Sequence, residues 1–135
     1  MNSTYWINSI MSTAYTNSSG QFWLGLSSTL PVAGGTGVSE PSGGAYSRVQ
    51  ILAFSQPSNG MVKNTAALSF PQSTATWFDS DHKARYWVLF DGSGSGAHLL
   101  SAGLLDEART IESNTTVTIA AESLKITLSD YQTVT

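Results

Sequence analysis

The residues best suited to chemistry in this sequence are Asp79, Asp81 and His82, which lie within four positions of one another. Carboxylates and imidazole are ordinary ligands for divalent cations, and two carboxylates held at a defined separation can hydrolyse a glycosidic bond. Their spacing matches no established cation-binding loop, and no second acidic cluster completes a coordination shell. We therefore interpret the three residues as part of a solvated turn, and we predict no metal site.

The other histidine, His98, has no acidic or serine neighbour poised as in a catalytic triad, so we interpret it as a strand-end histidine bonded to backbone groups. The run Gly34-Gly35-Thr36-Gly37 suggests a phosphate cradle. It lacks the lysine, the hydroxyl residue and the helix start that make such a cradle work. We predict no catalytic residue, no cofactor and no enzymatic activity.

The composition describes a chain with few charges. Only 11% of its 135 residues are charged, against roughly 25% in ordinary domains, so its surface must consist of small polar residues and glycine. Six Lys and Arg are spread along a chain of net charge -3, without the basic stripe that binds nucleic acid. The sequence contains no cysteine, which excludes disulfides and thiolate metal sites. We expect no nucleic-acid partner.

The N-terminal sequence MNSTYWINSIMSTAY has neither a basic segment nor a continuous apolar segment, so we do not interpret it as a secretory signal. No apolar run approaches the roughly 20 residues that a membrane-spanning helix needs. We therefore predict a protein that does not insert into a membrane.

The segment that organises the predicted fold is residues 84–105, in which two apolar arms, 86–90 and 98–105, flank the turn DGSGSG. Aromatic and β-branched residues in the first arm favour a strand in the middle of a sheet. Further strands are predicted at residues 21–26, 46–54, 66–70, 115–119 and 124–128, with a turn at 57–60. Together they predict an all-β fold, a single-domain antiparallel β-sandwich (jelly-roll-like) of about eight strands over residues 1–135.

Two features lie outside this strand pattern. Residues 4–15 are predicted to form a short amphipathic α-helix, capped by Ser3 or Thr4. Its apolar stripe packs either on its own sheet or against a neighbouring subunit, and consists of Trp6, Ile7, Ile10, Met11 and Ala14. Residues 27–44 are rich in glycine and proline and predict a long loop, a feature that is often functional or held by a partner. The candidate subunit contacts are Trp6, Ile10, Trp23, Pro31 and Pro41.

The chain resembles small bacteriophage virion proteins, which are described as tail-fibre-like or minor structural proteins. The matching segments are GLSSTLP at 25–31, GTGVSEPSGGAYSR at 35–48, residues 64–71 with Trp77, residues 88–91, 99–100 and 103–104, and residues 116–128. The resemblance covers residues 22–129 in order. It departs from the family pattern at residues 78–84, where a short polar link is usual, and at Glu122-Ser123.

The resemblance implies a virion component without enzymatic activity, assembled in the cytoplasm of the bacterial host. It also implies association with itself, as a homotrimer, and with other virion proteins. Tail fibre or baseplate appendage is the favoured position, with a role in assembly or host recognition, and a capsid decoration protein is an alternative. Strand edges buried against identical neighbours would suit such an assembly.

A carbohydrate-binding module is an alternative of a different class. Its predicted binding rim would combine an aromatic platform with polar groups that bind sugar hydroxyls, and the partner would then be a host surface glycan. The candidate rim residues are Trp77, Phe78, Asp79, Asp81 and His82. A free-standing module should be a monomer, whereas an appendage protein should form oligomers.

Overall fold

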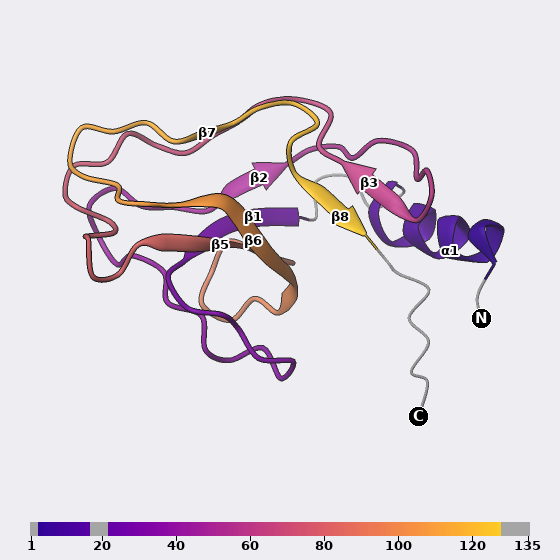
Figure 1. Ribbon diagram of the computed structural model, residues 1–135, viewed down its shortest axis with the longest axis horizontal. Coiled ribbons are helices and arrows are strands. Elements are labelled where there is room, and N and C mark those ends of the chain that lie inside the picture. The colour runs from indigo at the N-terminus through magenta and orange to yellow at the C-terminus, as the bar shows by residue number, and fades with distance from the viewer. Residues whose placement is uncertain (1–2, 17–21, 128–135) are drawn as a thin grey trace. The chain divides into compact units, whose positions relative to one another are not determined.

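The structure is a computed structural model that describes residues 3–16 and 22–127 (Figure 1). These residues form mostly strands, with one short α-helix near the N-terminus, which confirms the predicted all-β class and the strand number. The elements are α1 (Thr4–Met11), the π-helical η1 (Ser12–Thr16), β1 (Phe22–Ser27), β2 (Val49–Ile51), β3 (Met61–Lys63), β4 (Leu68–Ser69), β5 (Ala84–Phe90), β6 (Leu99–Arg109), β7 (Thr118–Ile119) and β8 (Lys125–Thr127). Within this part of the chain, no helix is long and apolar enough to cross a membrane.

Contacts within the chain divide it into two compact units. Unit 1 comprises Met1–Gly20, Ile51–Leu68 and Ile119–Thr135, and unit 2 comprises Gln21–Gln50 and Ser69–Thr118. The strands form a four-stranded sheet in the order β2-β1-β5-β6 and two-stranded sheets β3-β8 and β4-β7. The single domain over residues 1–135, the sandwich and the jelly-roll order stay predictions.

Strand β5 is the centre of unit 2, as its aromatic and β-branched sequence predicts. It pairs antiparallel with β1, with Leu24 opposite Leu89, and antiparallel with β6, with Ala102 opposite Val88. Val88 and Leu89 point to opposite faces of the sheet and are both fully buried, so both faces are covered here. Because both faces of β5 are covered at this point, its successive residues 88–90 are all apolar.

Close packing in this sheet depends on glycine at β6. A Cβ at Gly103 would lie 2.5 Å from Cζ2 of Trp87, which it faces across the strand pair. We expect Gly103→Ala to lower the free energy of unfolding by about 2 kcal/mol, because the indole would have to shift in a packed region. Urea denaturation would measure this, and Gly96→Ala is the matched control, since nothing lies within 4 Å of its Cβ position. Equal midpoints for the two variants would contradict the prediction.

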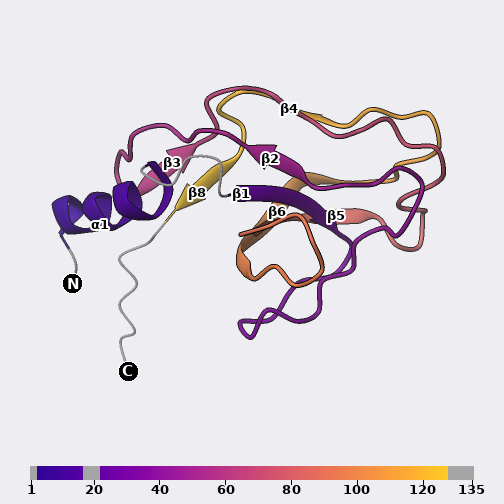
Figure 2. The same cartoon turned by 180° about the vertical axis from the view of Figure 1, so that it is seen from behind.

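The loop between β1 and β2 has no strand or helix from residue 28 to residue 48, and it extends away from the sheet in both views (Figures 1 and 2). It is nevertheless internally bonded. The Ser28 amide donates to the Ser39 carbonyl over 3.1 Å, and the buried Ser27 hydroxyl accepts from the Ser39 amide over 2.9 Å. The serine at the end of β1 therefore helps to close the part of this loop between residues 28 and 39.

Three predicted strands are shorter than expected. The strand predicted over residues 46–54 is limited to β2. Ala45, directly before the predicted strand, has a φ of 66°, and Phe54 at its end pairs only through an isolated bridge with Asn64. The strand predicted over 66–70 is limited to β4, and the strand predicted over 115–119 is limited to its partner β7. The short strand β3, which was not predicted, follows the predicted turn at residues 57–60.

Unit 1 packs around the β3–β8 pair, in which Val62 lies opposite Ile126 and both are buried. The buried Asn64 follows β3 and joins the two arms of this unit. Its amide nitrogen donates to the carbonyls of Ala66 and Ala120 over 2.8 and 3.0 Å, and its side-chain oxygen accepts from the Leu124 amide over 2.9 Å. One polar side chain thus satisfies three backbone groups where no regular ladder does.

Helix α1 also belongs to unit 1 and begins as predicted, because the Ser3 hydroxyl caps it by accepting from the Trp6 amide over 3.2 Å. Ile7 and Met11 are buried. Ala14, which was predicted to share their face, is exposed, because the π-helical η1 has a wider turn and shifts the face. Tyr15 instead contacts Phe54, with ring centroids 5.3 Å apart.

Candidate functional site

The five residues of the predicted rim do not share one environment. Trp77 and Phe78 are 7% and 3% exposed. The Trp77 indole donates to the Gly44 carbonyl over 2.7 Å and packs edge-on against Tyr46, while the Phe78 backbone pairs with Ile111. The two rings therefore belong to the core of unit 2, and the exposed aromatic platform expected from the sequence is not formed.

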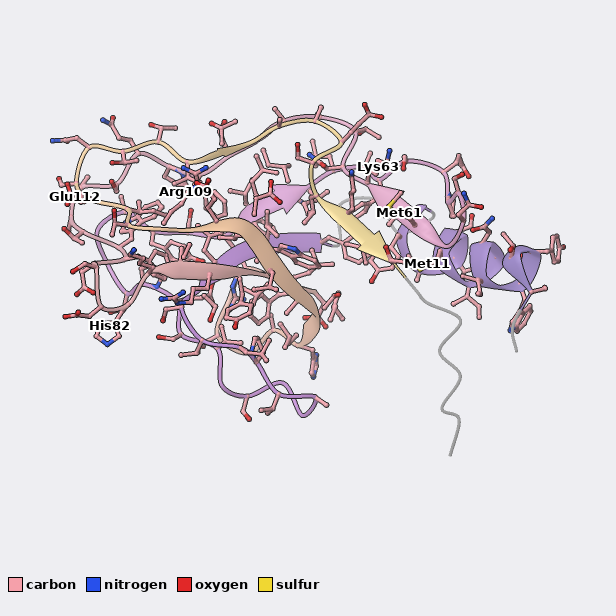
Figure 3. The ribbon with its side chains drawn as sticks, in the orientation of Figure 1. Met11, Met61, Lys63, His82, Arg109 and Glu112 are labelled. Carbon is pink, nitrogen blue, oxygen red and sulfur yellow. The ribbon has the colours of Figure 1, made fainter. Side chains whose placement is uncertain are left out.

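The polar residues of the predicted rim, Asp79, Asp81 and His82, are exposed and form hydrogen bonds with one another. The Asp79 carboxylate accepts from the amides of Asp81 and His82 over 3.0 and 2.8 Å, and it lies 3.2 Å from the His82 ring. The bond from the His82 amide is the main reason that the pKa of Asp79 lies below its usual value. Figure 3 shows His82 on the outside of this turn. Asp79 thus caps the backbone amides of its own turn. Within the described residues, no group of three or more His, Asp or Glu side chains could hold a metal ion.

The structure corrects the interpretation of His98, which does have an acidic neighbour. Asp91 accepts from the His98 amide over 2.7 Å and lies 2.9 Å from its ring, and the Asp91 amide donates to the His98 carbonyl over 3.1 Å. These contacts, led by the amide bond, lower the pKa of Asp91. The two residues close the glycine-rich turn between β5 and β6 at an exposed position. The turn glycines separate them in sequence, so their pairing was visible only once the hairpin ends were brought together.

A cluster of charged residues that the sequence analysis did not single out lies over the sheet of unit 2. Arg48 binds Glu40 through two nitrogens, at 2.7 and 3.1 Å, and the two side chains are only 11% and 15% exposed. One Arg48 nitrogen also donates to the carbonyls of Gly92 and Gly94 over 3.1 and 3.0 Å. The guanidinium carbon lies 3.5 Å from the centre of the Phe90 ring. Arg48 therefore connects the β1–β2 loop to the β5–β6 turn.

The third member of this cluster is Tyr46, whose hydroxyl donates to Glu40 over 2.5 Å and accepts from the Leu26 amide over 3.1 Å. Burial, and secondarily the bond to Glu40, raises the pKa of this hydroxyl far above its usual value. Tyr46 donates to Glu40 as a neutral hydroxyl, and the cluster joins the two loops. One sequence signal pointed to it: Glu40 is the only acidic residue before Asp79, and Arg48 lies eight positions later.

The candidate subunit contacts fall in both units. Trp6 and Ile10 lie one turn apart on α1 and are 55% and 38% exposed, although both belong to the predicted apolar stripe. In unit 2, Trp23, Pro31 and Pro41 are half-buried. The structure brings Trp6 and Ile10 together on one helix face.

Strand β6 provides a further apolar surface that the sequence analysis did not include. It ends the four-stranded sheet, so within the described residues one of its edges has no neighbouring strand. Leu104 is 73% exposed and Leu100 is 45% exposed. Beyond Leu104 the strand bulges, because residues 105–108 lie opposite Arg85 alone. The register also shifts at Leu100, which has no partner residue opposite it on β5. The accessible part of this edge is the uncharged segment that contains the two leucines.

The model of a family described as podophage GP4 fiber I protein gp80 matches residues 2–127. No curated protein matches the chain. The match spans nearly the whole sequence and confirms the resemblance to tail-fibre-like phage proteins. The chain therefore belongs to the podophage GP4 fiber I protein gp80 family, and the protein is a fibre component of the phage virion.

Proposed function

We propose that this protein is a non-enzymatic assembly subunit of the phage fibre, and that it associates with copies of itself through the edge of β6. A fibre protein must contact other virion proteins, and an unpaired strand edge is a natural place for such a contact. The observation that carries the proposal is the exposure of Leu100 and Leu104 on this edge. A homotrimer is the proposed assembly.

Charge supports a second copy as the occupant of this edge. The chain carries a net charge of -3, so copies repel one another at long range. Strand β6 has no ionised side chain before Asp106, however, so two copies can approach here without placing like charges together. The apolar area of the two leucines would then be removed from water.

Assembly is favoured over glycan recognition by the placement of the aromatic residues. The sugar-binding alternative depended on Trp77 and Phe78 as stacking surfaces, and both rings are buried. Their neighbours Asp79 and His82 bind each other. Host recognition and a position in the baseplate have no comparable support from the described residues.

The molar mass in solution tests this proposal. We expect light scattering after size exclusion to give a trimer for the wild-type protein, and a monomer for Leu104→Lys, because a charge would have to be buried in the interface. The matched control is Leu52→Lys, since Leu52 is 68% exposed and follows β2, the strand at the opposite end of the sheet from β6. A wild-type monomer at every concentration, or equal loss of assembly in both variants, would contradict self-association through β6.

A further inference from the structure

Asn59-Gly60 is the only Asn-Gly pair in the sequence, and this pair is chemically fragile. Asparagine is thermolabile because the next backbone nitrogen can attack its side-chain carbonyl. Glycine in the next position offers the least steric resistance, since it has no Cβ. The structure decides whether this reaction can occur in the folded protein.

The pair forms the tip of a tight turn that precedes β3. Asn59 has a φ of 53° and Gly60 a φ of 72°, the positive values of a two-residue hairpin turn. The Ser58 amide donates to the Met61 carbonyl over 3.0 Å, and the Met61 amide donates to the Ser58 carbonyl over 3.1 Å. Asn59 is exposed, so water reaches its side chain. The closed turn limits rotation of the backbone that would carry the Gly60 nitrogen towards that side chain.

Asn8 of α1 binds the backbone amide of Gly60, whose nitrogen is the nucleophile in this reaction. The Gly60 amide donates to the side-chain oxygen of Asn8 over 2.7 Å, and Gly60 is buried. Attack requires this amide to lose its proton, and a proton held in a good hydrogen bond is harder to remove. Both residues belong to unit 1, so the contact is internal to that unit.

We propose that Asn59 is a deamidation site that Asn8 keeps unreactive while α1 is docked. In the reaction, the Gly60 nitrogen forms a bond to Cγ of Asn59, and the bond from Cγ to Nδ2 breaks. The Gly60 proton leaves with the side-chain nitrogen as ammonia, and a five-membered imide remains. Water then opens the imide at either carbonyl, and the product is aspartate or isoaspartate. No oxidant, metal or cofactor takes part.

The product would change unit 1 in a defined way. Either product replaces a neutral amide by a carboxylate, and isoaspartate also routes the backbone through Cβ. The lengthened backbone cannot keep both bonds between Ser58 and Met61, which require a two-residue turn. Because the protecting oxygen lies on α1, release of this helix removes one of the two restraints on the reaction and should speed it, while the closed turn remains. A higher fraction of aspartate or isoaspartate at position 59 would therefore indicate that α1 has been released.

The test compares wild-type protein, Asn8→Ala and Asn8→Asp during incubation in mildly alkaline buffer. Peptide mapping by mass spectrometry measures aspartate and isoaspartate at Asn59. We expect Asn8→Ala to deamidate about tenfold faster than wild type, the factor that corresponds to loss of one hydrogen bond. Asn8→Asp should stay close to wild type, because its carboxylate still accepts from Gly60. Asn114, exposed with a φ of 65° and followed by Thr115, is the internal control and should react equally in all three proteins.

Circular dichroism first establishes that each variant is folded. A folded Asn8→Ala that reacts no faster than wild type would overturn the proposal. If Asn8→Ala does not fold, the wild-type rate in native buffer is compared with the rate in urea, and likewise for Asn8→Asp. Slow native reaction in both proteins supports protection by a hydrogen-bond acceptor at position 8. Native rates equal to those in urea overturn it.

Discussion

Replacement of Arg48 by methionine is expected to lower the free energy of unfolding by about 3 kcal/mol, the range for breaking a buried ion pair. Arg48 and Glu40 are largely shielded from water, so methionine would leave the Glu40 carboxylate buried without its cation. The carbonyls of Gly92 and Gly94 would also lose their donor. Urea denaturation followed by tryptophan fluorescence measures the change.

Two further variants separate the buried pair from a general charge effect. Arg109 forms an exposed pair with Glu107 at 3.5 Å, so Arg109→Met should change the free energy of unfolding by at most about 0.5 kcal/mol. Glu40→Leu combined with Arg48→Met should cost less than the sum of the single changes, because no uncompensated charge remains. If Arg48→Met and Arg109→Met had the same effect, the cluster would not hold the loops together.

Replacement of Asn64 by alanine is expected to have an effect of similar size, about 3 kcal/mol, in unit 1. The Leu124 amide and the carbonyls of Ala66 and Ala120 would lose their partner inside a core from which water is excluded. Alanine would also leave a cavity where the amide was packed. Hydrogen exchange would show faster exchange at Leu124 than in wild-type protein.

The neighbouring Thr65→Ala is the matched control for Asn64→Ala. Thr65 is exposed and its hydroxyl makes only a long contact, 3.4 Å, with the Ala53 carbonyl. Its loss should change the free energy of unfolding by no more than about 0.5 kcal/mol. A cost for Asn64→Ala as small as that of Thr65→Ala would show that water replaces the amide and that Asn64 does not hold unit 1 together.

Local sequence signals were sufficient for the strand content, the central hairpin, the N-terminal cap and the tight turn before β3. Each depends on neighbours in sequence: an apolar run for β5, a hydroxyl at Ser3, and the pair Asn59-Gly60. The family was also visible from short ordered segments. These features are local because backbone dihedral preferences and capping bonds act over a few residues.

The candidate site depended on contacts that join distant residues, and here the sequence was insufficient. Trp77 and Phe78 beside two aspartates have the composition of a binding rim, yet pairing with Ile111 and packing on Tyr46 bury both rings. In the same way, Asp91 becomes the partner of His98 only when the hairpin closes. Composition cannot show which side of a strand is covered, because that depends on what the rest of the chain places over it.

Local sequence patterns and short ordered segments were enough to predict a mostly β-structured phage fibre component with an N-terminal helix. The tertiary structure alone decided that Arg48 connects two loops, that Asn8 reaches Gly60, and that β6 ends its sheet with exposed leucines. The physical reason is one of range. Strand and turn preferences are properties of adjacent residues, whereas ion pairs, side-chain caps and free sheet edges exist only after segments far apart in sequence have met.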